Sequence, residues 1–408
     1  MRKLGPARTA CILLLVGVAA MASAQTFETL VNFSKSSGQY PVYSPLIQGT
    51  DGNFYGTSEG SNNNYGMVYQ VTSKGAVTPL YSFCAQKGCT DGRFPTGGVI
   101  QGSNGNFYGV TGGGGAKDAG VIYEVTPAGV ETVLYSFCPL TGCPDGSLPI
   151  AGLVEGSDGN FYGTTHRGGA NGDYGNYGTI FKITPSRQYT VLYSFCSQAN
   201  CADGESPAAP LIQASNGNFY GTTEYGGVSP YCADQSLGCG TLFEITPEGK
   251  FTTLYTFCSQ ANCTDGFYPY NLVQASNGNI YGIAYIGGAN GDGAIFQLSP
   301  SGNVSTLYSF CSQSSCSDGE SPDGPLVQGT NGSLFGTTLA GGGVLGFGNG
   351  FGTVFAITPT GKLTTLHSFR SLEGMYPAGV LQASDGTLYG VTEEGGANQD
   401  GTLFSLMQ

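Results

Sequence analysis

One six-residue phrase occurs seven times, and this repeat constrains the fold more than any other feature. The first copy, Asp-Gly-Asn-Phe-Tyr-Gly, occupies residues 51–56. Close variants occupy residues 104–109, 158–163, 216–221, 277–282, 331–336 and 385–390. Measured between the aromatic residues that precede the last glycine, the steps are 53, 54, 58, 61, 54 and 54 residues. A period of this length indicates a repeat architecture, in which each copy forms one supersecondary unit.

Each unit is predicted to form four antiparallel strands. In the fourth copy, segments rich in aromatic and β-branched residues lie at 210–214, 219–223, 240–246 and 251–257. Such segments, separated by glycine and proline, are typical of strands. Asn216-Gly217 predicts a tight turn between the first two, because this pair accepts positive φ. Seven units of four strands predict an all-β fold, a seven-bladed β-propeller.

Two series of aromatic residues recur at fixed positions of the predicted strands. We interpret both as packing between adjacent blades, because large aromatic side chains usually fill a core. The third-strand series is Tyr69, Tyr123, Phe181, Phe243, Phe296, Phe355 and Phe404. The fourth-strand series is Phe33, Phe83, Phe137, Phe195, Phe257, Phe310 and Phe369.

The two ends of the repeated region predict closure of the ring. Residues 27–33 have the pattern of a fourth strand without the three that precede it. Residues 401–406 have the pattern of a third strand without a fourth. We expect these segments to pair and to complete the last blade, since this removes two open sheet edges.

Residues 1–24 have the pattern of a secretory signal peptide. Basic residues are followed by an apolar run at 11–21, which is too short to span a bilayer, and by Ala-Ser-Ala at 22–24. A retained membrane anchor is the alternative. We therefore expect one propeller domain at 25–408, without a membrane span, in a secreted, periplasmic or cell-surface protein. Its 11 basic and 27 acidic residues give a net charge of −16, which disfavours nucleic acid as a partner.

Twelve cysteines remain after the predicted cleavage. In an exported chain, an even number of regularly spaced cysteines indicates disulfides. Zinc is the alternative, but it requires four ligands and each pair offers two. The repeated spacing favours local pairing of Cys84/Cys89, Cys138/Cys143, Cys196/Cys201, Cys232/Cys239, Cys258/Cys263 and Cys311/Cys316.

The cysteine loops and the glycine-rich loops are predicted to share one face of the ring, which is the candidate binding surface. An acidic residue followed by glycine recurs in the first set of loops, and we expect these carboxylates to form a ring around the channel mouth. They are Asp91, Asp145, Asp203, Asp265, Asp318 and Glu373. One hypothesis is that they bind a cation, with calcium as the candidate, or a polyol. The alternative is that each aspartate stabilises its own turn.

Other chemical signals are few. His166, in a glycine-rich loop beside Arg167, is the histidine best placed to reach the loop face. The loops at 168–173 and 287–292 resemble Gly-Asp calcium repeats, but each blade has at most one, so ordinary turns are the alternative. No nucleophile elbow, phosphate loop or zinc-protease motif occurs, so no catalytic residue is assigned. A pair of carboxylates is still sufficient for a glycosidase.

The whole unit resembles a known tandem repeat. Gly-Asn-Phe-Tyr-Gly-Thr-Thr, Gly-Thr-Leu-Phe-Glu-Ile-Thr-Pro and Thr-x-Leu-Tyr-Ser-Phe together are similar to the Gloeobacter–Verrucomicrobia (GloVer) repeat of exported bacterial proteins. A looser resemblance is to streptogramin-lyase-like propellers, which would imply a histidine and acidic metal ligands around the channel.

Three functions are compatible with these observations. We expect a non-catalytic exported protein that binds an extracellular ligand (a carbohydrate, a cation or a protein) on the disulfide-loop face, without an obligatory cofactor. The first alternative is a hydrolase or lyase with a carboxylate site at the channel mouth. The second is a purely structural envelope protein.

Overall fold

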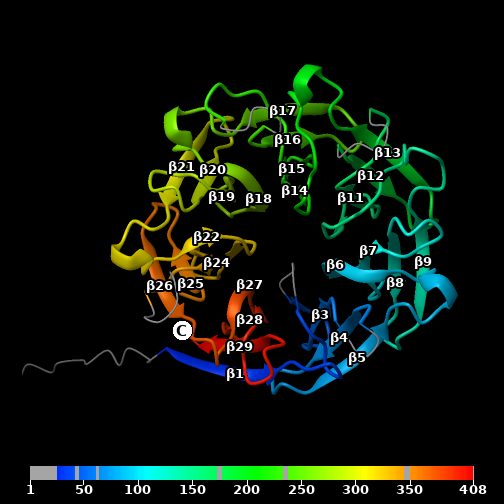
Figure 1. Cartoon of the computed structure of the whole chain (residues 1–408), viewed down its shortest axis with the longest axis horizontal. Helices are drawn as coiled ribbons and strands as arrows, with labels where there is room; N and C mark the ends of the chain where they lie inside the picture. Colours follow the sequence, from blue (N-terminus) through cyan, green and yellow to red (C-terminus); the bar gives the residue numbers. More distant parts are fainter. Residues whose placement is uncertain are drawn as a thin grey trace, which may run out of the picture.

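Seven antiparallel sheets are arranged in a ring around a central axis (Figure 1). The computed structural model describes residues 25–41, 46–60, 64–171, 177–232, 238–343 and 350–407, so the predicted signal peptide lies outside the described residues. Within each blade the chain runs from the axis outward, and the fourth strand is at the periphery. The predicted seven-bladed β-propeller is therefore confirmed.

Six blades are each formed from one continuous part of the chain. In order they contain β2 (Ile47–Gln48), β3 (Phe54–Ser58), β4 (Met67–Val71) and β5 (Val77–Ser82); β6 (Arg93–Gln101), β7 (Phe107–Gly113), β8 (Val121–Val125) and β9 (Glu131–Ser136); β10 (Val154–Glu155), β11 (Phe161–Thr165), β12 (Thr179–Ile183) and β13 (Tyr189–Ser194); β14 (Ile212–Gln213), β15 (Phe219–Thr223), β16 (Thr241–Ile245) and β17 (Phe251–Thr256); β18 (Phe267–Gln274), β19 (Ile280–Ile286), β20 (Ala294–Leu298) and β21 (Val304–Ser309); and β22 (Glu320–Pro322), β23 (Val327–Gln328), β24 (Leu334–Ala340), β25 (Thr353–Ile357) and β26 (Leu363–Ser368). In the sixth blade, β22 and β23 are two pieces of one inner strand, since both pair with β24.

The seventh blade joins the two ends of the described chain. It contains β27 (Met375–Gln382), β28 (Leu388–Glu394), β29 (Thr402–Met407) and, as its outer strand, β1 (Thr26–Asn32). Strand β1 pairs with β29 in antiparallel register, with Phe27 opposite Leu406 (Figure 1). The predicted closure is confirmed, and it covers the edge that β29 would otherwise expose.

Adjacent blades are held together by aromatic pairs. The phenylalanine after each outer strand contacts the third-strand aromatic of the next blade, with ring centroids 4.8 to 5.6 Å apart. All fourteen rings are at most 1% exposed. The third-strand ring also requires a glycine on the neighbouring strand: a Cβ on Gly221 would lie 2.5 Å from the Phe243 ring. Both aromatic series therefore pack between blades, as predicted.

A second set of contacts runs around the face that carries the short Asn-Gly turns. A backbone N–H in each turn donates a hydrogen bond of 2.8 to 3.0 Å to a glutamine or glutamate side chain of the next blade. The pairs are Thr50–Gln101, Ser103–Glu155, Ser157–Gln213, Ser215–Gln274, Ser276–Gln328, Thr330–Gln382 and Ser384–Gln48. The last pair joins the seventh blade to the first, so this hydrogen-bonded ring is also closed.

The opposite face carries the long loops. In each of six blades, the glycine-rich loop donates a backbone hydrogen bond of 2.8 to 3.0 Å to the preceding interblade loop, as Gly227 does to the Cys201 carbonyl. The two loop types therefore share one face, as predicted, and we call it the loop face. Within the described residues, no helix has the length and apolar character needed to cross a membrane.

Replacing Phe27 should show how much the closing strand contributes to stability. Its ring stacks on His367 at 3.8 Å and on Phe404 at 5.5 Å. We expect Phe27→Ala to lower the free energy of unfolding by about 2 kcal/mol, because a half-buried ring leaves a cavity at the seam. Urea unfolding measures the loss, and Met407→Ala, at a 58% exposed position of β29, is the control. Equal stability of the two variants would show that β1 does not hold the ring closed.

Candidate functional site

Six disulfides stiffen the loop face. They join Cys84–Cys89, Cys138–Cys143, Cys196–Cys201, Cys232–Cys239, Cys258–Cys263 and Cys311–Cys316, as the spacing predicted. Five of them close the short loops that lead from an outer strand to the next inner strand. The Cys232–Cys239 disulfide lies in the glycine-rich loop of the fourth blade and packs against Cys258.

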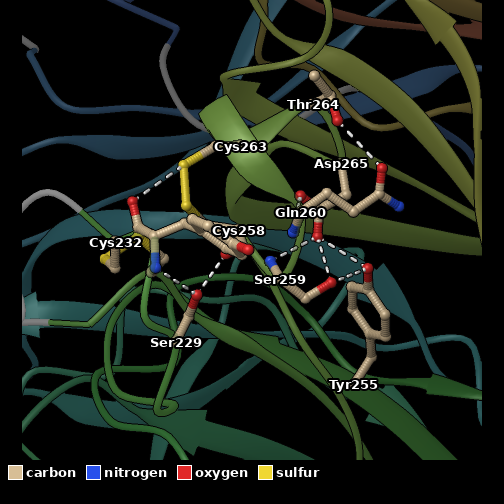
Figure 2. The surroundings of a disulfide bond; sticks show 11 residues. Ser229, Cys232, Tyr255, Cys258, Ser259, Gln260, Cys263, Thr264 and Asp265 are labelled. Carbon is tan, nitrogen blue, oxygen red and sulfur yellow. Dashed lines mark hydrogen bonds between the residues drawn. A yellow bond between two sulfur atoms is a disulfide. The ribbon is translucent and has the colours of Figure 1, made fainter.

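Each aspartate of the predicted ring is hydrogen-bonded within its own disulfide loop. Figure 2 shows Asp265 beside the Cys258–Cys263 bond. Its carboxylate accepts hydrogen bonds from the Tyr255 hydroxyl at 2.8 Å, the backbone and hydroxyl of Ser259 at 2.8 and 2.9 Å, and the Gln260 N–H at 3.2 Å. Asp265 is 3% exposed. These bonds occupy the carboxylate and hold the loop against the outer strand.

The same arrangement recurs, with variations, in the other loops. Asp203 and Asp318 each accept four such bonds, Asp91 accepts three, and Asp145 accepts two. Glu373 accepts from the Arg370 N–H at 3.1 Å and lies 3.3 Å from His367 Nε2.

The predicted placement of these carboxylates around the channel mouth is corrected by the structure. Their tyrosine or histidine partners belong to β5, β9, β13, β17, β21 and β26, which are the outer strands of their blades (Figure 1). The acidic residues therefore lie near the rim. The reason is that they stand early in a loop that starts at the rim and only later reaches the axis. Their geometry matches the turn-stabilising alternative.

A cavity of ≈ 310 Å³ lies where the seven blades meet. Every blade contributes at least one lining residue, which is possible only at the axis. The lining residues are Glu59, Thr96, Ile150, Ala151, Gly152, Ala208, Pro210, Glu224, Tyr270, Asn271, Asp323, Gly324, Pro325 and Ala378. They lie where inner strands begin and where second strands end, so the cavity is at the loop-face end of the axis. We call it the axial pocket.

Two positions of the repeat supply most of its distinctive side chains. One directly follows a proline that recurs near the start of the inner strand: Thr96, Ile150, Ala208, Tyr270, Asp323 and Ala378. The other is the third residue after the glycine of the repeated phrase: Glu59, Gly112, His166, Glu224, Tyr285, Leu339 and Glu393. Both positions vary from blade to blade while their neighbours recur. That variation inside a regular repeat is the sequence signal by which the pocket could have been found.

The regular pairing of several inner strands with their second strands is interrupted at the axial pocket. Strands β6, β18 and β27 are bulged there, and β22 and β23 are separated by residues 323–326. At the bulge in β18, Asn271 has a φ of 40° and donates a hydrogen bond of 3.0 Å to the Asp323 carbonyl. Bulges redirect side chains next to binding sites, and here they bring Tyr270 and Asn271 to the axis.

Three carboxyl groups near the pocket interact unfavourably with their surroundings. Burial raises the pKa of Glu59 and of Asp323. Burial, followed by the charges of Asp323, Glu394 and Glu59, raises the pKa of Glu393 to about 7. Like charges that share a poorly hydrated site disfavour ionisation. The surroundings therefore favour the neutral, protonated form of these carboxyl groups.

Glu224 lies beside two tyrosines and the predicted site residue His166. Burial and then the Glu224 carboxylate raise the pKa of Tyr270, and the same causes act on Tyr225. Burial lowers the pKa of His166, while Glu224 acts in the opposite direction. The structure thus brings His166 toward the axial carboxylates and separates it from the rim aspartates. Glu59, Glu224, Asp323, Glu393, Tyr270 and Asn271 were not predicted as site residues.

No preformed metal site includes the axial carboxylates. Among the described residues, only two groups of three acidic, histidine or cysteine ligand atoms lie within 4.8 Å of one another. Each includes both sulfurs of a disulfide, Cys196–Cys201 or Cys311–Cys316, and a disulfide offers no thiolate. Of the two calcium-like loops, the one at 287–292 is closed by a bridge between Gly287 and Asp292, and Asp173 of the other lies outside the described residues.

Comparison with known sequences identifies the repeat. The sequence profile described as Gloeobacter/Verrucomicrobia repeat matches residues 18–171 and 231–408. No curated protein matches the chain.

Comparison with solved structures supports the fold. The chain is similar to the extracellular domain of a proposed hybrid two-component system, BT4673, from B. thetaiotaomicron, with a TM-score of 0.57 and 14% identity. That match covers 93% of this chain and 39% of the other. It is also similar to PorZ, a surface component of the type-IX secretion system of Porphyromonas gingivalis, with a TM-score of 0.52, 14% identity, and 92% and 47% coverage. A periplasmic gluconolactonase of Pseudomonas aeruginosa matches with a TM-score of 0.47 and 15% identity over 89% and 96% of the two chains.

Replacing a rim aspartate should affect stability and leave calcium binding unchanged. Asp203 accepts bonds from Tyr193, Ser197 and Gln198. In Asp203→Asn the amide group meets these donors and cannot accept from all of them, so we expect a loss of about 2 kcal/mol. Thermal unfolding measures the loss, and calorimetry with calcium measures binding, with Glu248→Gln as the control. A calcium signal present in the parent and absent only in Asp203→Asn would restore the cation hypothesis at the rim.

The pKa of Glu393 predicts a pH-dependent stability. Its folded-state pKa is raised from 4.5 to about 7, so the folded protein resists losing this proton. The stabilisation is therefore present below about pH 4.5 and is lost as the pH rises toward 7. We expect Glu393→Gln to melt at a higher temperature than the parent at pH 8 and at nearly the same temperature at pH 4.5. If the variant and the parent melt at the same temperature at pH 8 as well as at pH 4.5, ionisation of Glu393 does not destabilise the folded protein.

Proposed function

The chain belongs to the Gloeobacter/Verrucomicrobia repeat family, and we propose that it is an exported, non-catalytic protein that binds a small extracellular ligand in the axial pocket. The observation that carries this proposal is one cavity to which all seven blades contribute. The ring fixes the walls of that cavity, and it is at the low end of the volume range of small-molecule sites.

The composition of the pocket walls supports ligand binding. Carboxylates of Glu59, Glu224 and Asp323 and the amide of Asn271 offer hydrogen-bond acceptors and donors. Small and apolar residues of the third and fourth blades, including Ile150 and Pro210, form an apolar part of the wall. Sites that bind small molecules typically combine an apolar wall with a few placed polar groups.

Export is supported by the disulfides. Six local disulfides are stable only in an oxidising compartment such as the periplasm or the cell exterior. The two solved structures with the higher TM-scores are an extracellular domain and a surface component. At 14% identity they show the fold alone, so export of this chain rests on its own cysteines and on the N-terminal pattern.

A second candidate is a hydrolase or lyase that uses the same carboxylates. Glu393, with a pKa of about 7, is protonated enough near neutral pH to act as a general acid. A nearby ionised carboxylate would supply the complementary base, as in glycosidases.

A ligand screen with matched variants distinguishes these candidates. The mature chain is applied to a glycan array and to a small-molecule thermal-shift library, and is incubated with chromogenic glycosides and lactones. Glu224→Gln and Asp323→Asn alter the pocket, and Glu248→Gln, on an exposed turn of the opposite face, is the control. We expect a ligand whose affinity falls at least about tenfold in both pocket variants, without turnover.

Two results would contradict the binding proposal. Turnover that Asp323→Asn abolishes would establish the enzyme instead. Ligands that bind equally to all variants, or the absence of any ligand, would move function to another surface or to a structural role in the envelope.

A further inference from the structure

The charged residues that line the axial pocket are all acidic. Among the described residues, its lining includes three carboxylates, those of Glu59, Glu224 and Asp323, and no lysine or arginine. Glu393 adds a fourth acidic group close enough to interact with Asp323 and Glu59. These residues come from four different blades, and Glu59, Glu224 and Glu393 occupy one position of the repeat at which the other blades carry no acidic residue. An anionic ligand would be repelled at such a site.

Asp323 differs from the rim aspartates in its hydrogen bonding. It is partly exposed and lines the pocket, burial raises the pKa of its carboxyl group, and no hydrogen bond to that group is found among the described residues. The rim aspartates show the contrast, because each accepts at least two hydrogen bonds from its own loop and the adjoining outer strand. A partly buried carboxylate that accepts no hydrogen bond is unfavourable, so a ligand that donates hydrogen bonds to it would remove part of that cost.

A single metal ion does not fit this arrangement well. Calcium requires six to eight oxygen ligands at short distance, whereas no three axial carboxylates bring their oxygens within 4.8 Å of one another in the described residues. The opposite wall, with Ile150, Ala151, Ala208 and Pro210, offers apolar surface that a hydrated ion could not use. The carboxylates and the apolar wall together match a molecule with a charged end and a carbon body.

We propose that the axial pocket binds an organic cation, a protonated amine on a compact carbon or sugar framework, and this inference rests on the binding function proposed above. The ammonium group donates hydrogen bonds to the Asp323 carboxylate and is attracted by Glu59 and Glu393. The body of the ligand lies against the apolar wall. Tyr270, which lines the pocket between Glu224 and Asp323, offers an aromatic ring of the kind that attracts organic cations.

Matched amine and neutral compounds test the charge directly. Isothermal titration at pH 7, where the amino groups of both amines are mainly protonated, compares glucosamine with glucose and N-acetylglucosamine, and cyclohexylamine with cyclohexanol. Each set keeps the ring and removes the positive charge. We expect the amine in at least one set to bind at least about tenfold more tightly than its neutral partners. Asp323→Asn should remove that advantage, and Glu248→Gln should preserve it.

The outcomes separate this inference from the proposed function. Neutral compounds that bind as tightly as amines, with affinity that depends on Asp323, would overturn the cation inference and leave the binding function standing. Calcium that displaces the amine, or that binds alone in a manner dependent on Asp323, would replace the inference with a metal site. Failure of every amine to bind at millimolar concentration overturns it outright, whereas failure of the whole ligand screen overturns both proposals.

Discussion

The contact on which the structure depends is the packing of one blade's terminal phenylalanine against the third-strand aromatic of the next blade. Each four-stranded sheet leaves both faces apolar, and only its neighbours cover them. The contact is made seven times, and the contact of Phe33, which directly follows β1, with Tyr69 joins the seventh blade to the first. An open ring would leave two blade faces in water, so closure is part of the core. The axial pocket also depends on it, because the ring holds seven inner edges at a fixed distance from the axis.

Much of the fold could be predicted because the information is local and repeated. The Asn-Gly turns, the aromatic registers and the cysteine spacing recur in nearly every unit, so their interpretation in one blade was supported by the others. The pocket could not be found in this way. Glu59, Glu224 and Glu393 share a repeat position that is not acidic in the other blades, and Asp323 stands at another position. They meet because the ring brings different blades to one axis. The recurrence of the aspartates in the disulfide loops suggested a ring of binding residues. Their bonds to Tyr193, Tyr255 and Tyr308 show that these recurring residues hold the loops in place. The residues that line the pocket are instead the ones that differ from blade to blade.

The stiff loops and the pocket are connected through the backbone. Each disulfide loop carries the chain from the rim to the axis and ends at the proline that begins an inner strand. The residue after that proline lines the pocket, as Tyr270 and Asp323 do. A disulfide and an aspartate anchor the outer half of the loop, as Figure 2 shows for Cys258–Cys263 and Asp265, and so limit how far the inner half can move. The rim residues therefore help to fix the positions of the residues that line the axial pocket, although they do not line it themselves.

The pairing of β1 with β29 also has a consequence for how the molecule is made. Phe27 leaves the ribosome early, whereas its partner Leu406 is added almost four hundred residues later. Until then the first strand has no companion, and the growing chain carries unsatisfied backbone groups that could pair with another molecule. Contacts so distant in sequence form slowly. We therefore expect β1 to remain unpaired until β29 has been synthesised, so that closure of the ring is the last step of folding.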